Sequence, residues 1–158
     1  MSFDEILNIP PYSLVEEEKG KLLTERLVEL TKLHRKKCPK YKSMLEAFSF
    51  NVDTVKSYKN LPFLPVRLFK EMDLRSVTQD AVVKTMTSSG TTGQNVSKVY
   101  LDRAISSNQQ KAMVKIVSEF TGSSRMPMII IDCPSVVKNR AMFSARGAGI
   151  LGFSVFGA

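Results

Sequence analysis

The sequence lacks several features that mark particular classes of protein. Among its 158 residues there is no tryptophan, a single histidine and only two cysteines, Cys38 and Cys133. Two cysteines do not make a disulfide scaffold, and their small number predicts a reducing compartment. Residues 1–11 contain Asp4 and Glu5 but no basic residue, which is unlike a signal or transit peptide. No uncharged apolar run reaches the roughly 20 residues of a membrane-spanning helix. We therefore expect a cytoplasmic protein without a membrane span.

Acidic residues are scarce in the second half of the chain. Residues 1–80 hold 14 basic and 12 acidic side chains, whereas residues 81–158 hold 9 basic and 3 acidic ones. Most of the formal net charge of +8 therefore arises after residue 80, and no carboxylate occurs between Asp80 and Asp102. A basic surface can attract nucleic acid, an acidic surface or a phosphorylated small molecule, although a solvated lysine-rich face gives the same composition.

Capping signals and apolar periodicity predict a helical first part. Ser2 with Glu5, and Ser13 with Glu16, have the spacing of a capping box. From residue 13 to about residue 37 the apolar residues keep a helical period, which Pro39 should end before a shorter helix over 41–48. A surface turn after the long helix explains a basic cluster there better than a nucleic-acid site does. The cluster consists of Lys32, Arg35, Lys36, Lys37, Lys40 and Lys42.

Beyond residue 60 the pattern becomes that of an α/β protein. Residues 61–65 (LPFLP) form a stiff extended segment, because each proline restricts itself and its predecessor. Alternating strands and helices then predict an α/β fold. We expect a helical segment over 1–60 and a partial α/β nucleotide-binding domain over 61–158. The expected strands are 81–86, 97–101, 128–133 and 153–156. The expected helices are 66–72, 103–120 and 141–151. The helix over 103–120 should be capped by Asp102 and ended by Gly122.

The last twelve residues, 147–158, carry no charge. Because chain termini usually finish in polar sequence, we expect the chain to be part of a longer enzyme. Its apolar end would then lack its cover, and this predicts a homo-oligomer that contacts itself through residues 141–158. The apolar side chains concerned are Ile150, Leu151, Phe153, Val155 and Phe156.

The cysteines and the histidine give no catalytic assignment. Cys38 lies among lysines and is expected to be exposed, whereas Cys133 ends an apolar run and is expected to be buried. His34 has no identifiable partner, so we interpret it as a helix-surface residue and not as a general base. The sequence therefore identifies no catalytic residue and no metal ligand.

One short stretch has the composition of a ligand-binding loop. Residues 87–93 (TSSGTTG) contain five hydroxyls and two glycines, with Lys84 before them and Lys98 after them. Glycines let backbone N–H groups converge on an anion, and hydroxyls and lysine add donors, so the stretch predicts a polyphosphate site. It is not a Walker A loop, since the glycines are only three apart. A hairpin turn without a ligand is the alternative. The candidate phosphate-binding residues are Thr87, Ser88, Ser89, Gly90, Thr91, Thr92, Gly93 and Lys98.

This stretch resembles the phosphate-binding loop of the adenylate-forming ligase superfamily. Its context is similar, more narrowly, to the acyl-protein synthetases of bacterial bioluminescence operons, and more distantly to phenylacetate–CoA ligases. Many relatives in the superfamily have Pro-Lys directly after the loop, whereas here residues 94–97 intervene before Lys98. The segments that carry the resemblance are 61–70 (LPFLPVRLFK), 86–93 (MTSSGTTG), 98–103 (KVYLDR) and 143–153 (FSARGAGILGF).

The resemblance implies an acid–thiol ligase that uses ATP and Mg²⁺. Such an enzyme converts a fatty acid to an acyl-adenylate and moves the acyl group to a cysteine of its own, and a partner reductase then makes the aldehyde. Ser88 to Gly93 would bind the β- and γ-phosphates. The acceptor cysteine and further motifs of the family lie beyond residue 158, so this chain alone is expected to be inactive. The alternatives are an acyl- or aryl-CoA ligase relative, or a non-catalytic domain that associates with itself.

Overall fold

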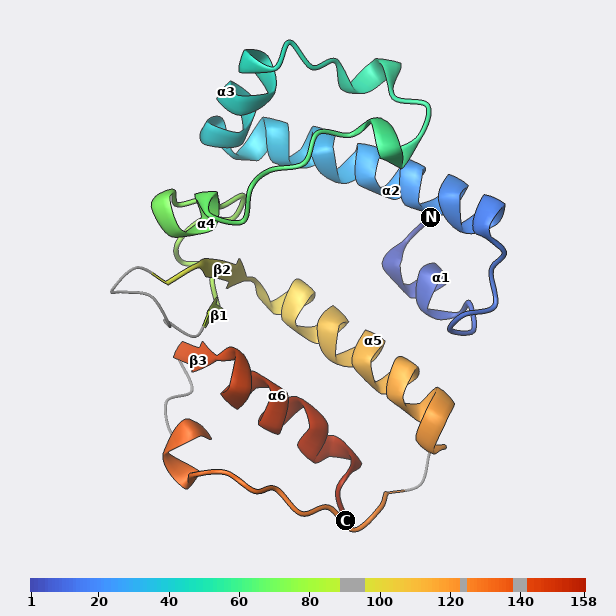
Figure 1. The fold of residues 1–158 in the computed structure, drawn as a ribbon, viewed down its shortest axis with the longest axis vertical. Coiled ribbons are helices and arrows are strands. Elements are labelled where there is room, and N and C mark those ends of the chain that lie inside the picture. Colours follow the sequence, from blue (N-terminus) through green and yellow to red (C-terminus); the bar gives the residue numbers. More distant parts are fainter. Residues whose placement is uncertain (89–95, 123–124, 138–141) are drawn as a thin grey trace.

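Helices form the first part of the computed structural model, which describes residues 1–88, 96–122, 125–137 and 142–158 (Figure 1). Helix α1 (Phe3–Leu7) begins at the predicted capping box, in which the Glu5 N–H donates to the Ser2 hydroxyl and the Ser2 N–H donates to the Glu5 carboxylate. The second predicted box is wrong. Helix α2 (Glu16–Lys37) has Val15 at its N-cap, and the Ser13 hydroxyl donates to the Pro10 carbonyl instead.

The buried part of this helical segment lies where α2 meets α3 (Pro39–Ala47) and the short 3₁₀ turn η1 (Val52–Thr54). Leu45 and Val52 are 1% and 3% exposed. Cys38 separates the two helices and is also buried, which corrects the prediction of an exposed thiol. Lysines lie close to it in sequence, but the bend between α2 and α3 turns this one position inward. The turn η2 (Tyr58–Asn60) is held to α2 by a 2.9 Å hydrogen bond from the Tyr58 N–H to Thr24 Oγ1.

A three-stranded sheet follows the short helix α4 (Leu68–Glu71). Its strands are β1 (Lys84–Thr87), β2 (Lys98–Leu101) and β3 (Met142–Ser144), in the order β2-β1-β3. Strand β1 pairs antiparallel with β2 and parallel with β3. The predicted α/β class is therefore confirmed, although the parallel partner β3 falls where the start of a helix was expected.

Two helices extend away from this sheet and lie side by side in Figure 1, α5 (Arg103–Thr121) and α6 (Ala145–Phe153). The predicted ends of α5 are confirmed. Asp102 Oδ1 accepts from the Ile105 N–H at 2.7 Å, and Gly122 ends the helix at φ +73°. The two helices approach closely at Gly152, where an added Cβ would come within 3.1 Å of Met113 Sδ. None of the described helices combines the length and apolarity needed to cross a membrane.

Two of the predicted strands are wrong. Residues 128–133 form no strand, and the side chains of Ile129 and Ile131 are 89% and 94% exposed. Residues 154–156 form a 3₁₀ turn, η4 (Ser154–Phe156), after α6. An apolar run becomes a buried strand only where it finds partners on its edges and faces, and here β3 occupies the edge of β1. Cys133, at the end of that run, is consequently exposed and not buried.

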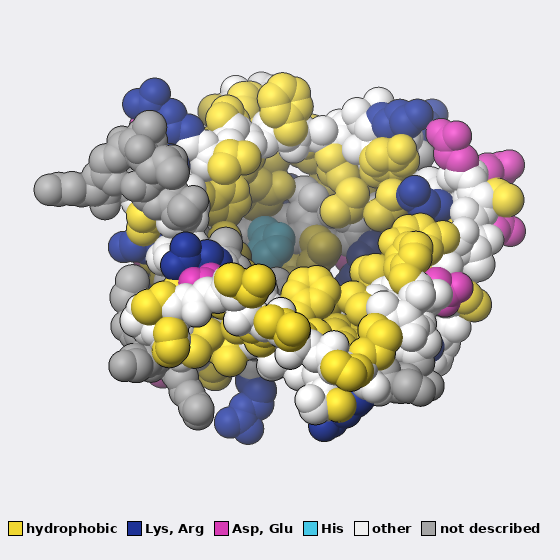
Figure 2. Space-filling view, turned by 60° about the horizontal axis from the view of Figure 1, so that its bottom comes forward, with side chains coloured by type: hydrophobic (Ala, Val, Ile, Leu, Met, Phe, Trp, Pro, Cys, Tyr) yellow, Lys and Arg dark blue, Asp and Glu magenta, His cyan; other side chains and the backbone are white. Residues whose placement is uncertain are grey.

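Figure 2 shows apolar side chains gathered around a hollow on one face.

Candidate functional site

The stem of the predicted phosphate-binding loop lies between β1 and β2. Thr87, the last residue of β1, pairs with Lys98, the first residue of β2. The Ser88 N–H donates to the Ser97 carbonyl at 3.2 Å, and the Ser97 N–H donates to Ser88 Oγ at 3.1 Å. These two bonds close the base of the loop. The remaining predicted site residues, Ser89, Gly90, Thr91, Thr92 and Gly93, lie outside the described residues.

The same edge of the sheet carries the beginning of α6. Strand β3 runs parallel to β1 with Ser144 opposite Thr87, and α6 starts at the next residue, Ala145. The carboxyl ends of parallel strands meet at one edge, and ligands of α/β proteins commonly bind there. The first N–H groups of a helix have no partner within the helix and carry partial positive charge, which favours an anion. The loop stem and the start of α6 therefore lie at one edge of the sheet.

Several hydroxyl and ammonium donors belong to this stem. Ser97 is only 9% exposed, and among the described residues its hydroxyl has no hydrogen-bond partner. The Ser88 oxygen accepts one bond from Ser97, which leaves its own hydrogen available to donate. Lys98 is exposed at the start of β2. Ionised phosphate oxygens accept hydrogen bonds, so this set of donors fits a phosphate group.

A polar cluster fixes β2 to the segment that precedes the sheet. The Arg75 guanidinium lies 5.4 Å from the centre of the Tyr100 ring, and its Nη2 is 3.7 Å from Asp73 Oδ2. Burial, followed by a hydrogen bond with Asp73, raises the pKa of the Tyr100 hydroxyl. One residue further on, Ser76 Oγ lies 2.7 Å from His34 Nδ1 on α2. The loop stem is thus linked through residues 73–76 to the helical segment.

Sequence reasoning missed one charged residue at this edge, Arg146. It lies in the first turn of α6, and its Nε is 3.1 Å from Asp132 Oδ2. A cation at that position opposes the helix dipole, and this was the signal that could have identified it. Next to Asp132, the exposed Cys133 has its Sγ 3.0 Å from Ser135 Oγ, and hydrogen bonds from Ser135 lower the pKa of the thiol.

The described residues contain no cluster of side chains that could hold a metal ion by themselves. No three His, Cys, Asp or Glu side chains are grouped there as a metal site would require. A magnesium ion that arrives with a nucleotide needs only one or two carboxylates, because the phosphates and water supply the other ligands.

One comparison with known proteins gives a match over almost the whole chain. A family model described as acyl-protein synthetase, LuxE, matches residues 2–157. No curated protein and no solved structure matches. The matched range includes α1 and α2, the loop between β1 and β2, and α6.

Proposed function

Since the chain belongs to the LuxE acyl-protein synthetase family, we propose that it takes part in the ATP-dependent activation of a fatty acid. In the reaction that we assign to the complete enzyme, the carboxylate of the acid attacks the α-phosphorus of ATP. Acyl-adenylate forms and pyrophosphate leaves. A cysteine thiolate then attacks the acyl carbon and AMP leaves. The thioester is the product that a reductase converts to an aldehyde, as in bacterial bioluminescence.

The observation that supports this proposal is the shared edge of the sheet at Thr87 and Ser144. There the loop stem at Ser88 and Ser97, the exposed Lys98 and the start of α6 lie at one edge of the sheet. We propose that Ser88 to Gly93 bind the β- and γ-phosphates of ATP, with Thr87 at the loop base. In this role they orient the nucleotide and stabilise the charge that develops on the departing pyrophosphate. A magnesium ion bound to the same phosphates would neutralise part of that charge.

Neither cysteine of this chain is assigned as the acyl acceptor. Cys38 is 4% exposed between α2 and α3, so an acyl-adenylate cannot reach its sulfur without local opening. Cys133 is exposed, but the family resemblance gives it no acceptor role. The proposed partners are a fatty acid substrate and a cytoplasmic acyl reductase.

Binding of ATP tests the proposal without requiring turnover. We expect ATP with Mg²⁺ to bind the chain in isothermal titration calorimetry. Lys98→Ala and Gly90→Ala should each weaken binding by about tenfold or more, because each removes or blocks contacts with charged phosphate oxygens. Lys115→Ala, which removes an exposed cation from α5, is the matched control and should bind as the unmodified chain does. Equal affinity in all of these proteins would show that the loop is only a turn.

A further inference from the structure

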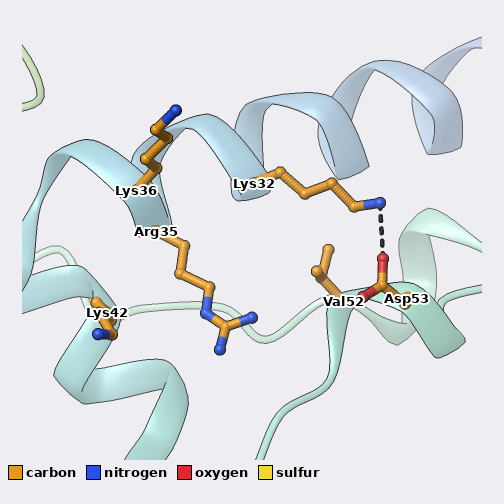
Figure 3. Close-up of a pocket in the computed structure, with 6 residues that line it drawn as sticks. All are labelled: Lys32, Arg35, Lys36, Lys42, Val52 and Asp53. Carbon is orange, nitrogen blue, oxygen red and sulfur yellow. Dashed lines mark ion pairs between the residues drawn. The ribbon is translucent and has the colours of Figure 1, made fainter.

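A hollow of about 480 Å³ lies between α2, α3 and η1 (Figure 3). Figure 3 shows Arg35 extending from α2 toward the space beside Val52, and Lys36 pointing away from it. The elements that form the hollow lie above the sheet in Figure 1. Four of the six lining residues are cations, and the full set is Lys32, Arg35, Lys36, Lys42, Val52 and Asp53.

Positive charge exceeds negative charge in this hollow. Lys32 Nζ is 2.7 Å from Asp53 Oδ1, and Lys42 Nζ is 3.8 Å from Glu46 Oε1. Among the residues that the structure describes, neither Arg35 nor Lys36 has a carboxylate within ion-pair distance. In the sequence, no carboxylate occurs between Glu29 and Glu46. An anion that enters the hollow therefore meets Arg35, a cation with no ion-pair partner among the described residues.

The position of the cations is not explained by the helix end alone. Basic side chains near the last carbonyls of α2 stabilise the negative end of its dipole. Lys42, however, belongs to the next helix and lines the same hollow. Lys32 likewise lies more than one turn before the end of α2, and its partner is on η1. Cations from two helices thus line one volume.

The chemistry of these side chains selects the ligand. A guanidinium offers a planar pair of donors that matches phosphate oxygens, and ammonium groups add mobile point charges. The volume lies within the roughly 300–1,000 Å³ of small-molecule sites, whereas an acidic peptide would require an extended groove. We propose that this hollow binds the phosphate group of a small phosphorylated molecule. The site is separate from the proposed ATP site and does not depend on it.

Asp53 gives this proposal a specific signature. The hydrogen bond and charge of Lys32, together with the charge of Arg35, hold the pKa of the Asp53 carboxyl below its usual range, so it stays ionised. Its negative charge repels a phosphate and occupies Lys32. The pair is exposed, with 54% and 68% of the two side chains accessible, so its loss costs little stability. Asp53→Asn should therefore tighten phosphate binding, an effect that damage to the fold would not produce.

The experiment is a titration of the full chain with inorganic phosphate, followed by backbone amide chemical shifts at constant ionic strength. We expect saturable shifts in residues 32–42 and 51–54. Arg35→Ala should weaken this binding by about tenfold. Asp53→Asn should strengthen it severalfold. Lys19→Ala, an exposed cation on the first turns of the same helix, is the matched control and should leave the affinity unchanged.

Two further arms separate this site from its alternatives. Lys98→Ala should leave the shifts in residues 32–54 unchanged, because the loop between β1 and β2 is a different site. A hexaglutamate peptide should bind more weakly than phosphate. Tighter binding of the peptide than of phosphate would identify an acidic protein partner and overturn the proposal. Absence of saturable shifts, or equal affinity in the Arg35→Ala and Lys19→Ala variants, would overturn it too.

Discussion

At the scale of single residues, His34 links parts of the chain that are distant in sequence. Its Nδ1 lies 2.7 Å from Ser76 Oγ, and its ring meets Tyr41 edge-on at a centroid distance of 6.3 Å. The prediction of a helix-surface position is confirmed. Its partner Ser76 is 42 residues away, and no local pattern reveals such a contact. Periodicity can assign a face of a helix, but the element that packs on that face depends on the whole fold.

The environment of His34 predicts a dependence of stability on pH. Partial burial lowers its pKa from the ordinary value of 6.5, because the charged ring loses hydration. As pH falls through about 6.5, His34 binds a proton in the unfolded chain, whereas in the folded chain it is still neutral. The free energy of unfolding should therefore decrease from about pH 7 toward pH 5. In His34→Gln, which cannot titrate, urea denaturation curves should show a shallower decrease. An equal slope in both proteins would contradict this role.

The two cysteines show how single residues escape sequence patterns. Cys38 lies in a lysine-rich stretch yet is buried, whereas Cys133 ends an apolar run yet is exposed. Both predictions rested on neighbours in sequence. Burial depends on neighbours in space. For Cys38 these are set by the bend between α2 and α3, and for Cys133 by the pairing of β3, and not of residues 128–133, with β1.

At the scale of elements, some helix ends could be predicted, although the capping box expected at Ser13 is absent. The capping box at Ser2 and the ends of α5 at Asp102 and Gly122 are all found as predicted. Capping depends on side chains three or four positions apart, so the sequence contains the full interaction. Strand pairing does not have this property. The run at 128–133 has the composition of a strand, but β3 at Met142–Ser144 forms the parallel pair with β1.

The cap of α5 predicts a measurable contribution to stability. Replacement of Asp102 by alanine removes the acceptor of the 2.7 Å bond from the Ile105 N–H. We expect the free energy of unfolding to fall by about 0.5–2 kcal/mol in urea denaturation. Asp102→Asn keeps an acceptor oxygen and should lose much less. If both variants lost the same amount, charge and not the hydrogen bond would be responsible.

The candidate site likewise has one part that the sequence could predict and one part that it could not. The stretch 87–93 could be identified as a phosphate-binding candidate because hydroxyls and glycines are dense there. The two strands predicted on either side of it are present and pair antiparallel, with Thr87 opposite Lys98. The approach of α6 to this edge could not be predicted, since it depends on the parallel pairing of β3. The roles of the individual loop residues stay predictions.

At the scale of the whole molecule, little apolar surface is fully buried. Among the described residues, the buried apolar side chains are Cys38, Leu45, Val52 and Leu101. Large apolar side chains remain accessible in several elements, and Figure 2 shows how they gather on one face. Near the end of the chain, Leu151, Phe153 and Val155 are 38%, 48% and 37% exposed. Such a surface favours association.

We therefore predict that the chain associates with itself through residues 141–158. Multi-angle light scattering at high protein concentration should give a mass above the 17.7 kDa of one chain. Phe153→Ser should weaken this association by about tenfold, because an exposed aromatic ring contributes strongly to contacts between chains. Val15→Ser, a change of a side chain that is 63% exposed near the start of α2, is the control. A mass of one chain at every concentration would contradict the prediction.

The parallel pair of β1 and β3 has a consequence for biosynthesis. Thr85 and Met142 are partners, yet 57 positions separate them, and the hairpin of β1 and β2 together with α5 lies between them. At about 5–20 residues per second, a ribosome needs several seconds to add that interval. During this time the hairpin can close, but one edge of β1 stays open to any other extended chain. Slow translation between the codons for residues 87 and 142 would lengthen this exposure, and a chaperone that covers extended strands would act in that interval.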